Sequence, residues 1–453
     1  MKKKRRFRKA DYEATENTQI TLGEALPTEH LARFVVEVVK LFDLNEIYAR
    51  YSERGGMPYA PEMMVGLLLY GYATGVFSSR KIERATYESI PFRYIAGNMH
   101  PDHATISQFR KDNLEALKGL FLQVLLIAQT MGYVKLGNIS IDGSKVHADA
   151  SKSKAVSYGR IQQMEKRLQK EIDELFALAE QAEGGRPEGV DIENELERRR
   201  KKLANLAEAK AVVEERARQR YAQEQAEYER KMAARREKEE KTGKKSRGRT
   251  PKPPEPGPRD KDQYNFTDPE SRIMKNGNNK GFDQSYNAQV AVEHESRLIV
   301  GNTLSNHPND KREGPPTAQA IPAELGKPKA AAMDNGYFSP YVIQAFEVMG
   351  IDPHISVGRD GHHVDLHTLL EGEPEPPPDN ADYKVKMVYK LQTEAGKAIY
   401  KLRKSTVEPV IGIIKEVMGF RQFSLRGLAA AAGEWSLVCL AYNLKRLHVI
   451  HIA

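Results

Sequence analysis

The sequence predicts an α/β protein in which a mixed-sheet domain is preceded by a helical region and interrupted by a long helical insert. Three observations lead to this prediction. Apolar residues recur at helical spacing from residue 28 to about residue 131, and short apolar strands alternate with helices after Gly281. A highly charged stretch with heptad spacing separates the first strand from the others. A chain of 453 residues can form more than one domain, and we divide it into four parts.

The first part is a strongly basic segment. Seven of the first nine residues are Lys or Arg, a density of like charge that cannot pack into a core. We expect residues 1–27 to form a flexible arm, which can follow the phosphates of a nucleic acid. The alternatives are a solvated tail or, in a eukaryote, a nuclear address.

Residues 28–134 are predicted to form an all-helical domain, which could bind DNA. Two segments, residues 78–84 and 105–111, have the composition of capped helix starts with polar and basic side chains on their exposed turns. The second could enter a DNA groove as a recognition helix does, although an ordinary surface helix would have the same pattern. The side chains that would contact DNA there are Ser107, Gln108, Arg110 and Lys111.

Residues 158–262 are predicted to be a helical hairpin followed by a basic linker. Apolar residues keep a seven-residue repeat on both sides of the turn at residues 184–187, which predicts an antiparallel coiled coil. Residues 244–258, rich in Lys, Arg, Pro and Gly, are expected to be flexible. The hairpin is either a solvated spacer or a surface for dimerisation or for contact with flanking DNA. Its seam residues are Ile161, Met164, Leu168, Leu175 and Leu178, then Ile192, Leu196, Leu203, Leu206 and Val213.

The catalytic domain is predicted to consist of residues 135–157 and 263–453. The strand at residues 138–146 and a hairpin after Gly281 should form three consecutive antiparallel strands, interrupted by the insert. The remaining pattern alternates helix and strand. We expect strands at 286–292, 298–301, 330–333 and 354–356, and helices at 318–325 and 339–349.

Three carboxylates are the main candidates for a metal site. Asp142 and Asp334 each end a short apolar run before a glycine-containing turn, so both should stand at the lip of the sheet. Glu408 lies in an amphipathic helix that we expect to begin near it, capped by Thr406 and with Pro409 in its first turn. Carboxylate oxygens are the ligands that hard divalent cations require. Other acidic residues could take these places, chiefly Asp283, Asp310 and Asp352.

On such a helix Glu408, Gly412 and Lys415 would share one face. The carboxylate could complete a metal site, the glycine could admit a phosphate, and Lys415 could bind that phosphate. The alternative is a surface helix whose Glu and Lys are merely solvated. The opposite, apolar face would hold Val410, Ile413, Ile414 and Val417.

The segments at residues 140–145, 334–338 and 403–410 resemble the DDE transposases of bacterial insertion sequences, in particular insertion-sequence family eleven eighty-two. The resemblance covers most of the chain and implies an RNase H-like core. It places the catalytic, metal-binding roles on Asp142, Asp334 and Glu408. Tyr400, Arg403, Glu408 and Lys415 resemble the Tyr-Arg-Glu-Lys signature of the wider superfamily, with a gap between Arg and Glu one residue longer than in its commonest form.

The resemblance implies an enzyme that binds the terminal inverted repeats of its element, cleaves the ends and joins them to target DNA. Two Mg²⁺ ions per site, replaceable by Mn²⁺, would serve the phosphoryl transfers. Tyr400, Arg403 and Lys415 would contact the DNA, and the chain would act as a homodimer that holds two ends. The alternatives are an RNase H-like nuclease without joining activity, and a catalytically silent DNA-binding protein descended from a transposase.

Composition agrees with a polyanionic partner, since the formal net charge is +8 and the pI is about 9.1. The single cysteine, Cys439, excludes an intrachain disulfide and suits a reducing cytosol. No apolar run is long enough for a membrane span, and no signal-peptide pattern follows the basic start. The absence of a phosphate-binding loop argues against a nucleotide cofactor. We therefore expect a bacterial cytoplasmic protein, associated with the nucleoid when bound to DNA.

Overall fold

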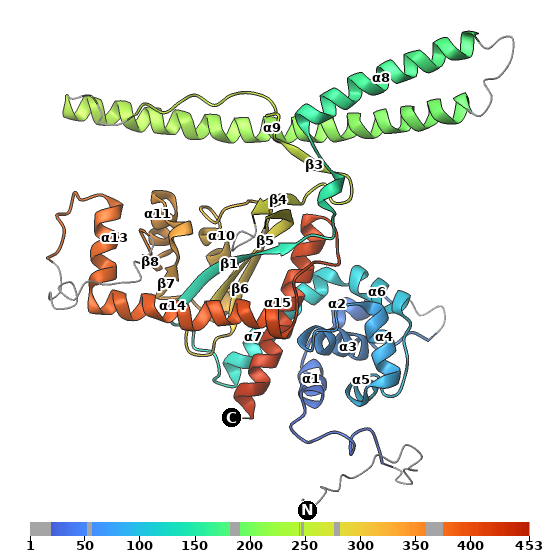
Figure 1. Ribbon diagram of the computed structural model, residues 1–453. Coiled ribbons are helices and arrows are strands. Elements are labelled where there is room, and N and C mark those ends of the chain that lie inside the picture. The colour runs from blue at the N-terminus through green and yellow to red at the C-terminus, as the bar shows by residue number, and fades with distance from the viewer. Residues whose placement is uncertain are drawn as a thin grey trace, which may run out of the picture.

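The computed structural model describes residues 20–51, 57–181, 191–243, 245, 249–275, 281–358 and 375–452. The basic start of the expected arm and the turn at residues 184–187 lie outside the described residues. The described chain has three parts (Figure 1): a mixed sheet with helices around it, a group of N-terminal helices beside it, and a long helical insert above the sheet. None of the described helices is both long enough and apolar enough to span a lipid bilayer.

Three antiparallel strands form one half of the sheet. β5 (Phe282–Glu293) lies in the middle, with β1 (Ile139–His147) antiparallel on one side and β6 (Ile299–Ser305) antiparallel on the other. The short β4 (Arg272–Lys275) lies on the same side of β5 as β6 and pairs with the first residues of β5. Nearly all of β5 is buried, as its central place in the sheet requires. The three predicted strands and their antiparallel order are therefore confirmed, although β4 was not expected.

Two parallel strands complete the sheet. β7 (Ala330–Met333) pairs with β1, and β8 (Asp352–Ile355) pairs with β7. The helix α11 (Pro340–Met349) connects them and agrees with the helix predicted at residues 339–349, with Ser339 as its cap. The helix predicted at residues 318–325 was wrong in extent, because α10 covers Gly314–Gln319 and only a 3-10 turn, Ala323–Leu325, follows. Pro322 lacks the N–H that would continue the helix.

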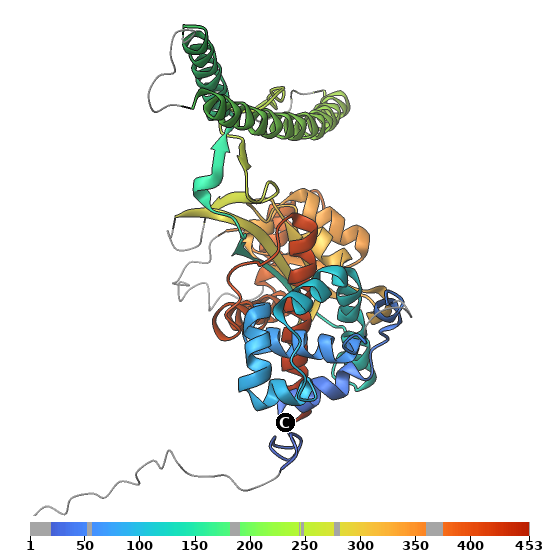
Figure 2. The ribbon, with the colours of Figure 1, turned by 90° about the vertical axis from the view of Figure 1, so that its right-hand side faces the viewer.

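The C-terminal helix α15 (Leu428–His451) joins the N-terminal helices to the sheet. It packs against α7 and α3 on one side and against β6 on the other, so that one hydrophobic core runs through both parts. Figure 2 shows the N-terminal helices gathered around it. These helices are α1 (Leu31–Val39), α2 (Asn45–Tyr48), α3 (Pro61–Ala73), α4 (Ser79–Glu88), α5 (Ile90–Ile95), α6 (His103–Asp112) and α7 (Leu114–Thr130).

The insert stands on a two-stranded stalk, in which β2 (Ala155–Ser157) pairs with β3 (Gln263–Asn265). Above it α8 (Tyr158–Gln181) packs against α9 (Ile192–Thr242) through a small hydrophobic cluster separate from the main core. The predicted helix pair is thus present, and predicted seam residues such as Leu168 and Leu206 lie in its cluster.

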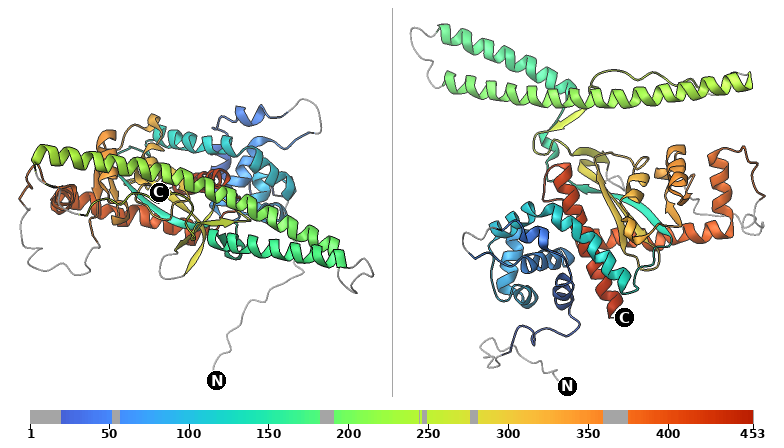
Figure 3. Two further views of the ribbon diagram at one scale, coloured as in Figure 1. Left: turned by 90° about the horizontal axis from the view of Figure 1, so that it is seen from above. Right: turned by 180° about the vertical axis from the view of Figure 1, so that it is seen from behind.

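The two arms of the insert differ in length. The helix α9 has 51 residues and α8 only 24. The second half of α9 therefore runs beyond the hairpin and passes over the sheet (Figure 3). The leucines and valines of the seam end at Val213, after which the helix lacks the apolar stripe that a partner helix would need.

Candidate active site

Asp142 and Asp334 lie beside each other on neighbouring strands, Asp142 within β1 and Asp334 directly after the end of β7. In the parallel pair β1 and β7, Ser140 is paired with Ala332, and each aspartate follows its paired residue by two positions. Parallel strands in register bring such positions side by side. The prediction for Asp334 is confirmed, since it directly follows β7. The prediction that Asp142 ends its strand before a turn at Gly143 was wrong, because β1 continues to His147 and Gly143 is paired with Gln289 of β5.

The surroundings of these aspartates disfavour their charged forms. Burial, with the negative charge of Asp334 and a smaller contribution from Asp310, raises the pKa of Asp142 to about 7. The N–H of Gly143, 2.8 Å from Asp142 Oδ1, and the Arg403 guanidinium act in the opposite direction. Burial also raises the pKa of Asp334. Two carboxylates that repel each other in a partly dry site form a strong attraction for a cation.

The helix that carries Glu408 begins much earlier than predicted. The helix α14 covers Glu394–Gly412, and its cap is Thr393, whose side chain accepts a hydrogen bond from the N–H of Gly396. Thr406 lies inside the helix and donates its hydroxyl hydrogen to the carbonyl of Leu402 at 2.8 Å. The predictions of a Thr406 cap and of Pro409 in the first turn were therefore wrong. The preceding residues, rich in Lys and Ala, have high helix propensity and carry the helix through Pro409.

Arg403 connects the carboxylates contributed by different elements. Its guanidinium nitrogen Nη2 is 2.9 Å from Glu408 Oε1, and Nη1 is 3.4 Å from Asp142 Oδ2. The side chain is buried, and its centre lies 5.8 Å from the centroid of the Tyr400 ring. A buried guanidinium between two carboxylates offsets part of their charge and holds Glu408 toward the sheet.

Lys415 also lies elsewhere than predicted. After Gly412 the chain forms a π-helical turn, Ile413–Val417, whose extra residue changes the helix face. The Nζ of Lys415 donates to the carbonyl of Lys145 on β1 at 2.9 Å, and burial lowers the pKa of Lys415. Val417, expected in the apolar face, is 64% exposed. Lys415 is therefore directed at the first strand, and the predicted apolar face ends before Val417.

Asp310 is a further carboxylate at this site. It is one of the three acidic residues that the sequence offered as alternative metal ligands. It lies in the loop after β6 and accepts hydrogen bonds from Asn287 at 2.7 Å, Gln289 at 2.9 Å and Lys145 at 3.2 Å. Its charge contributes to the raised pKa of both Asp142 and Asp334. Asp310 thus lies within electrostatic reach of the pair.

A buried polar network holds Asp310 in place. Gln289 also accepts a hydrogen bond from the hydroxyl of Tyr337, and a Cβ at Gly143 would lie 2.0 Å from its side-chain nitrogen. Glycine is therefore needed beside Asp142. The sequence carried a signal for this network, since Asn287 and Gln289 are polar residues on one face of an otherwise apolar strand.

The other two alternative candidates, Asp352 and Asp283, lie away from Asp142 and Asp334. Asp352 begins β8 and forms an ion pair with Lys390, while Asp283 lies at the start of β5 opposite Met274. Within the described residues, no three His, Cys, Asp or Glu side chains are close enough to hold one metal ion. Asp142 and Asp334 offer oxygen ligands suited to a hard divalent cation. Glu408 would have to break its ion pair with Arg403 before it could bind a metal ion together with the two aspartates.

The predicted recognition segment belongs to α6, which begins at His103 and is capped by Asp102. The Oδ1 of Asp102 accepts from the N–H of Thr105 at 2.8 Å, so Thr105 is not the cap. Ser107, Gln108 and Lys111 are exposed, and their contact with DNA stays a prediction.

Arg110 requires a correction, because it is buried and cannot read a base from that position. Its Nη1 donates to the hydroxyl of Tyr72 at 2.8 Å and to the carbonyl of Phe77, and it lies 3.9 Å from the buried Glu434 of α15. Arg110 is thus one of the groups that hold the N-terminal helices to α15.

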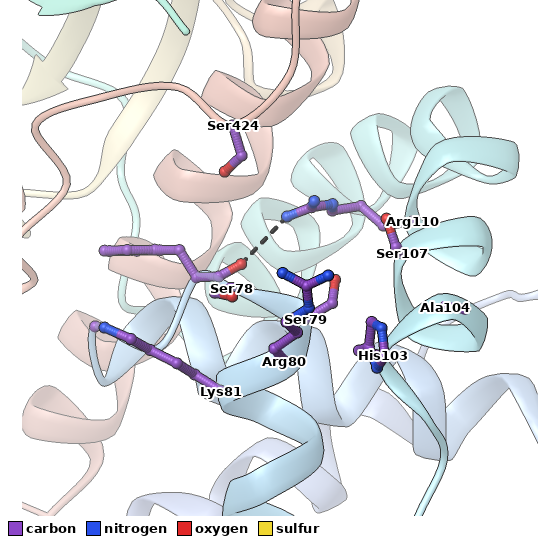
Figure 4. A pocket seen from close by; sticks show the side chains of 11 residues that line it. Ser78, Ser79, Arg80, Lys81, His103, Ala104, Ser107, Arg110 and Ser424 are labelled. Carbon is purple, nitrogen blue, oxygen red and sulfur yellow. Dashed lines mark hydrogen bonds between the residues drawn. The ribbon is translucent and has the colours of Figure 1, made fainter.

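The two predicted helix starts face each other across a cavity of about 540 Å³ (Figure 4). Ser78 precedes α4, whose first turn supplies Arg80 and Lys81, while Ser107 comes from α6. Basic side chains beside a helix N-terminus can contact a phosphate, and the binding of nucleic acid by this face stays a prediction.

Comparison with known families agrees with these features. Residues 20–112 match the family model described as "Transposase domain (DUF772)", and residues 249–444 match the one described as "Transposase DDE domain". Comparison with curated proteins and with solved structures gives no match. The matches cover the N-terminal helices and the part of the chain with Asp334 and Glu408, while Asp142 lies between them. Together they support a DDE transposase of an insertion sequence.

Proposed function

We propose that this chain, which carries the two matched transposase domains, binds the terminal inverted repeats of its insertion sequence, cleaves the DNA at the element ends and joins them to target DNA. The observation that carries the proposal is the pairing of β1 with β7, which supports Asp142 and Asp334 as two members of a catalytic set. Assignment to insertion-sequence family eleven eighty-two is part of the proposal.

The strand order supports an RNase H-like catalytic core. Three antiparallel strands, β1, β5 and β6, are followed by β7 and β8, which are parallel to β1, in the spatial order β6-β5-β1-β7-β8. In this arrangement the proposed catalytic residues occupy the first strand (Asp142), the end of the fourth core strand (Asp334) and a later helix (Glu408).

The cofactor in this proposal is Mg²⁺, for which Mn²⁺ can substitute, since DDE transposases generally use divalent cations. Asp142, Asp334 and Glu408 would hold two ions. When bound, the ions activate the attacking oxygen, first of water and then of a DNA 3′-hydroxyl, and stabilise the leaving 3′-oxygen.

The chain's own cations would position the DNA. Arg403, released from Glu408, presents up to two N–H groups to a phosphate, and Tyr400 supports its guanidinium through the ring face. Lys145 lies in the second half of β1, and Lys415 donates a hydrogen bond to its carbonyl. Both side chains add positive charge beside the site. The partner is DNA, and two chains would hold two element ends in one complex, in the bacterial cytoplasm and in contact with the nucleoid.

The test of this proposal removes ligand charge while preserving side-chain volume. Asp142→Asn, Asp334→Asn and Glu408→Gln should each abolish Mg²⁺-dependent cleavage of a duplex that carries the element end, and leave end binding largely intact. Asp352→Asn is the matched control, since its carboxylate is paired with Lys390 away from the site. Cleavage at the wild-type rate by one of the three variants would remove that residue from the catalytic set.

Joining is measured separately from cleavage. A pre-cleaved end supplied with target DNA should give strand-transfer products with the wild-type protein and none with the three variants. Cleavage without joining by the wild type would indicate a nuclease, and the absence of any metal-dependent cleavage would indicate a silent DNA-binding descendant.

A further inference from the structure

We propose that the cavity between α9 and the β4 side of the sheet is a binding groove for the DNA backbone, so that the insert grips the substrate beside the active site. This inference rests on the proposed function and assigns a role to the insert. The cavity has a volume of about 1010 Å³. Its walls come from α9, from the segment that returns to the stalk, from β4 and from the loop at residues 306–313.

Two arginines meet in this cavity without an acidic partner. Arg216 of α9 donates from Nη2 to the carbonyl oxygen of Pro269 at 2.7 Å, and Arg272 of β4 donates from Nη1 to the same oxygen at 2.9 Å. In the described part of the chain neither guanidinium forms an ion pair, and Nη1 of Arg216 is buried without a hydrogen-bond partner. Two cations held against one carbonyl repel each other and favour the arrival of an anion.

The local electrostatics agree with this geometry. Burial and the neighbouring charge of Arg216 lower the pKa of Arg272 to about 10, despite opposing contributions from Tyr286, Glu270 and Asp268. Burial lowers the pKa of Arg216 as well. Both shifts mean that the charged forms are poorly solvated, which a phosphate oxygen would relieve.

The rest of the lining is also predominantly basic. Seven Lys or Arg residues line the cavity against four Asp or Glu residues, and each of the four acids already has a partner. Asp262 pairs with Arg220, Glu224 with Arg259 and Glu313 with His307, while Glu270 accepts the N–H of Leu428. Three of the seven cations are also in ion pairs, since Arg312 pairs with Glu227. In the described residues Arg216, Arg272 and the exposed Lys261 and Lys311 are in no ion pair, and they outnumber the carboxylates of Glu270 and Glu313, so the lining keeps a net positive charge.

A single loop links the lining of the cavity to the candidate active site. That loop, residues 306–313, lines the cavity with Lys311 and Arg312 and carries Asp310, which lies beside Asp142 and Asp334. A strand whose phosphates contact Arg216 and Arg272 would thus reach the carboxylates without leaving the protein surface. Contacts to phosphates are independent of base sequence, so the groove would strengthen binding to any duplex.

The experiment removes the positive charge of Arg216 and Arg272 together. The control variant loses the same number of positive charges at positions of α9 outside the cavity. The full-length variant Arg216→Gln/Arg272→Gln is measured against Arg218→Gln/Arg236→Gln, which changes two exposed residues of α9 outside the cavity lining. Dissociation constants for an element-end duplex and a random duplex are measured by fluorescence anisotropy, without divalent metal, at several salt concentrations.

The cavity variant should bind both duplexes at least about tenfold more weakly, and its slope of log K against log salt should be smaller by about 2. The control should stay close to wild type. The melting temperature of the cavity variant should not fall, because the substitution relieves repulsion between like charges. Equal behaviour of the two variants would overturn the inference. Binding of labelled polyglutamate is measured in the same way, and a loss seen only with polyglutamate would also overturn the inference and would indicate an acidic protein partner.

A second variant covers the case in which the first does not fold. Lys261→Gln/Lys311→Gln changes only exposed side chains of the cavity and should weaken binding to both duplexes severalfold; unchanged binding would overturn the inference. Wild-type protein that binds neither duplex would contradict the proposed function itself, whereas wild-type binding that no cavity variant weakens would contradict the groove alone.

Discussion

Arg403 and Glu408, on the same helix, form an ion pair at 2.9 Å in which the arginine also reaches Asp142 on the first strand. Arg403 is buried, whereas the side chain of Glu408 is 47% exposed. A fixed cation is thus placed between two proposed metal ligands, and its charge competes with a metal ion for them. The same guanidinium could serve a phosphate once Glu408 has turned to a metal.

Arg403→Gln should therefore separate metal binding from catalysis. Removing the competing charge should increase the affinity for Mn²⁺, measured by isothermal titration calorimetry, by severalfold. DNA cleavage should nevertheless fall by about 10²-fold or more, because a charged group near the reacting phosphate is lost. Arg421→Gln is the control, since Arg421 pairs with Glu416 on the exposed surface. Unchanged metal affinity together with unchanged cleavage would show that Arg403 has only a structural role.

Asp142→Asn should stabilise the protein in the absence of divalent metal, and more so at higher pH. The folded-state pKa of Asp142, about 7, lies above the ordinary value of 3.8, so the folded state holds the proton more tightly than the unfolded state. Wild-type stability should fall as pH rises from about 4 to 7, whereas Asn has no such proton. In EDTA the variant should gain up to about 4 kcal/mol at pH 8 and little at pH 4, since each unit of the pKa shift corresponds to about 1.4 kcal/mol.

Thermal unfolding of both proteins across this pH range checks the expectation. A stability difference that is the same at every pH would mean that the Asp142 carboxyl has the same pKa in the folded and unfolded states. Addition of Mg²⁺ should reverse the order at pH 8, because the metal stabilises the wild type alone.

Arg110→Met should destabilise the fold instead of changing sequence preference. It removes the partner that Tyr72 and Glu434 share and leaves a fully buried carboxylate with fewer donors. We expect a loss of about 3 kcal/mol in the free energy of unfolding, measured by urea denaturation. Lys111→Met, at the exposed neighbouring position, should change it by less than about 0.5 kcal/mol. If both variants were equally stable, the buried network would not hold the N-terminal helices.

Replacing residues 158–262 with a short Gly-Ser linker should preserve the fold of the remaining chain. The linker would connect β2 directly to β3, which are already paired, and the insert's hydrophobic cluster is separate from the main core. Circular dichroism should show cooperative unfolding within a few degrees of the wild type, and metal binding should persist. The shortened protein should nick single ends but fail to form the paired-end complex.

Loss of cooperative unfolding would show instead that the insert stabilises the core. Normal strand transfer by the shortened protein would reduce the insert to a spacer.

Much of the local structure was predictable because it depends on neighbours in sequence. The strand Ala330–Met333 was predicted with its observed bounds. The presence of β5 and β6 was also predicted, from alternating apolar runs between turn residues. The paired helices of the insert follow from the heptads around Leu168 and Leu206. The start of the helix that carries Glu408 was predicted wrongly. Thr406 resembles a cap only when the helix-forming residues before it are ignored.

By itself, the sequence placed Asp334 at a strand end, because an apolar run followed by a glycine turn is a local signal. The same signal was wrong at Asp142, where pairing with the distant β5 carries the strand on through Gly143 to His147. Only the tertiary structure decided that these strands are neighbours in register, that Arg403 lies between Asp142 and Glu408, and that Arg110 is buried. The burial of a charged side chain depends on whether a distant segment supplies its partner, as Glu434 does for Arg110. Such pairings are set by the packing of the whole core and have no signature in the residues on either side.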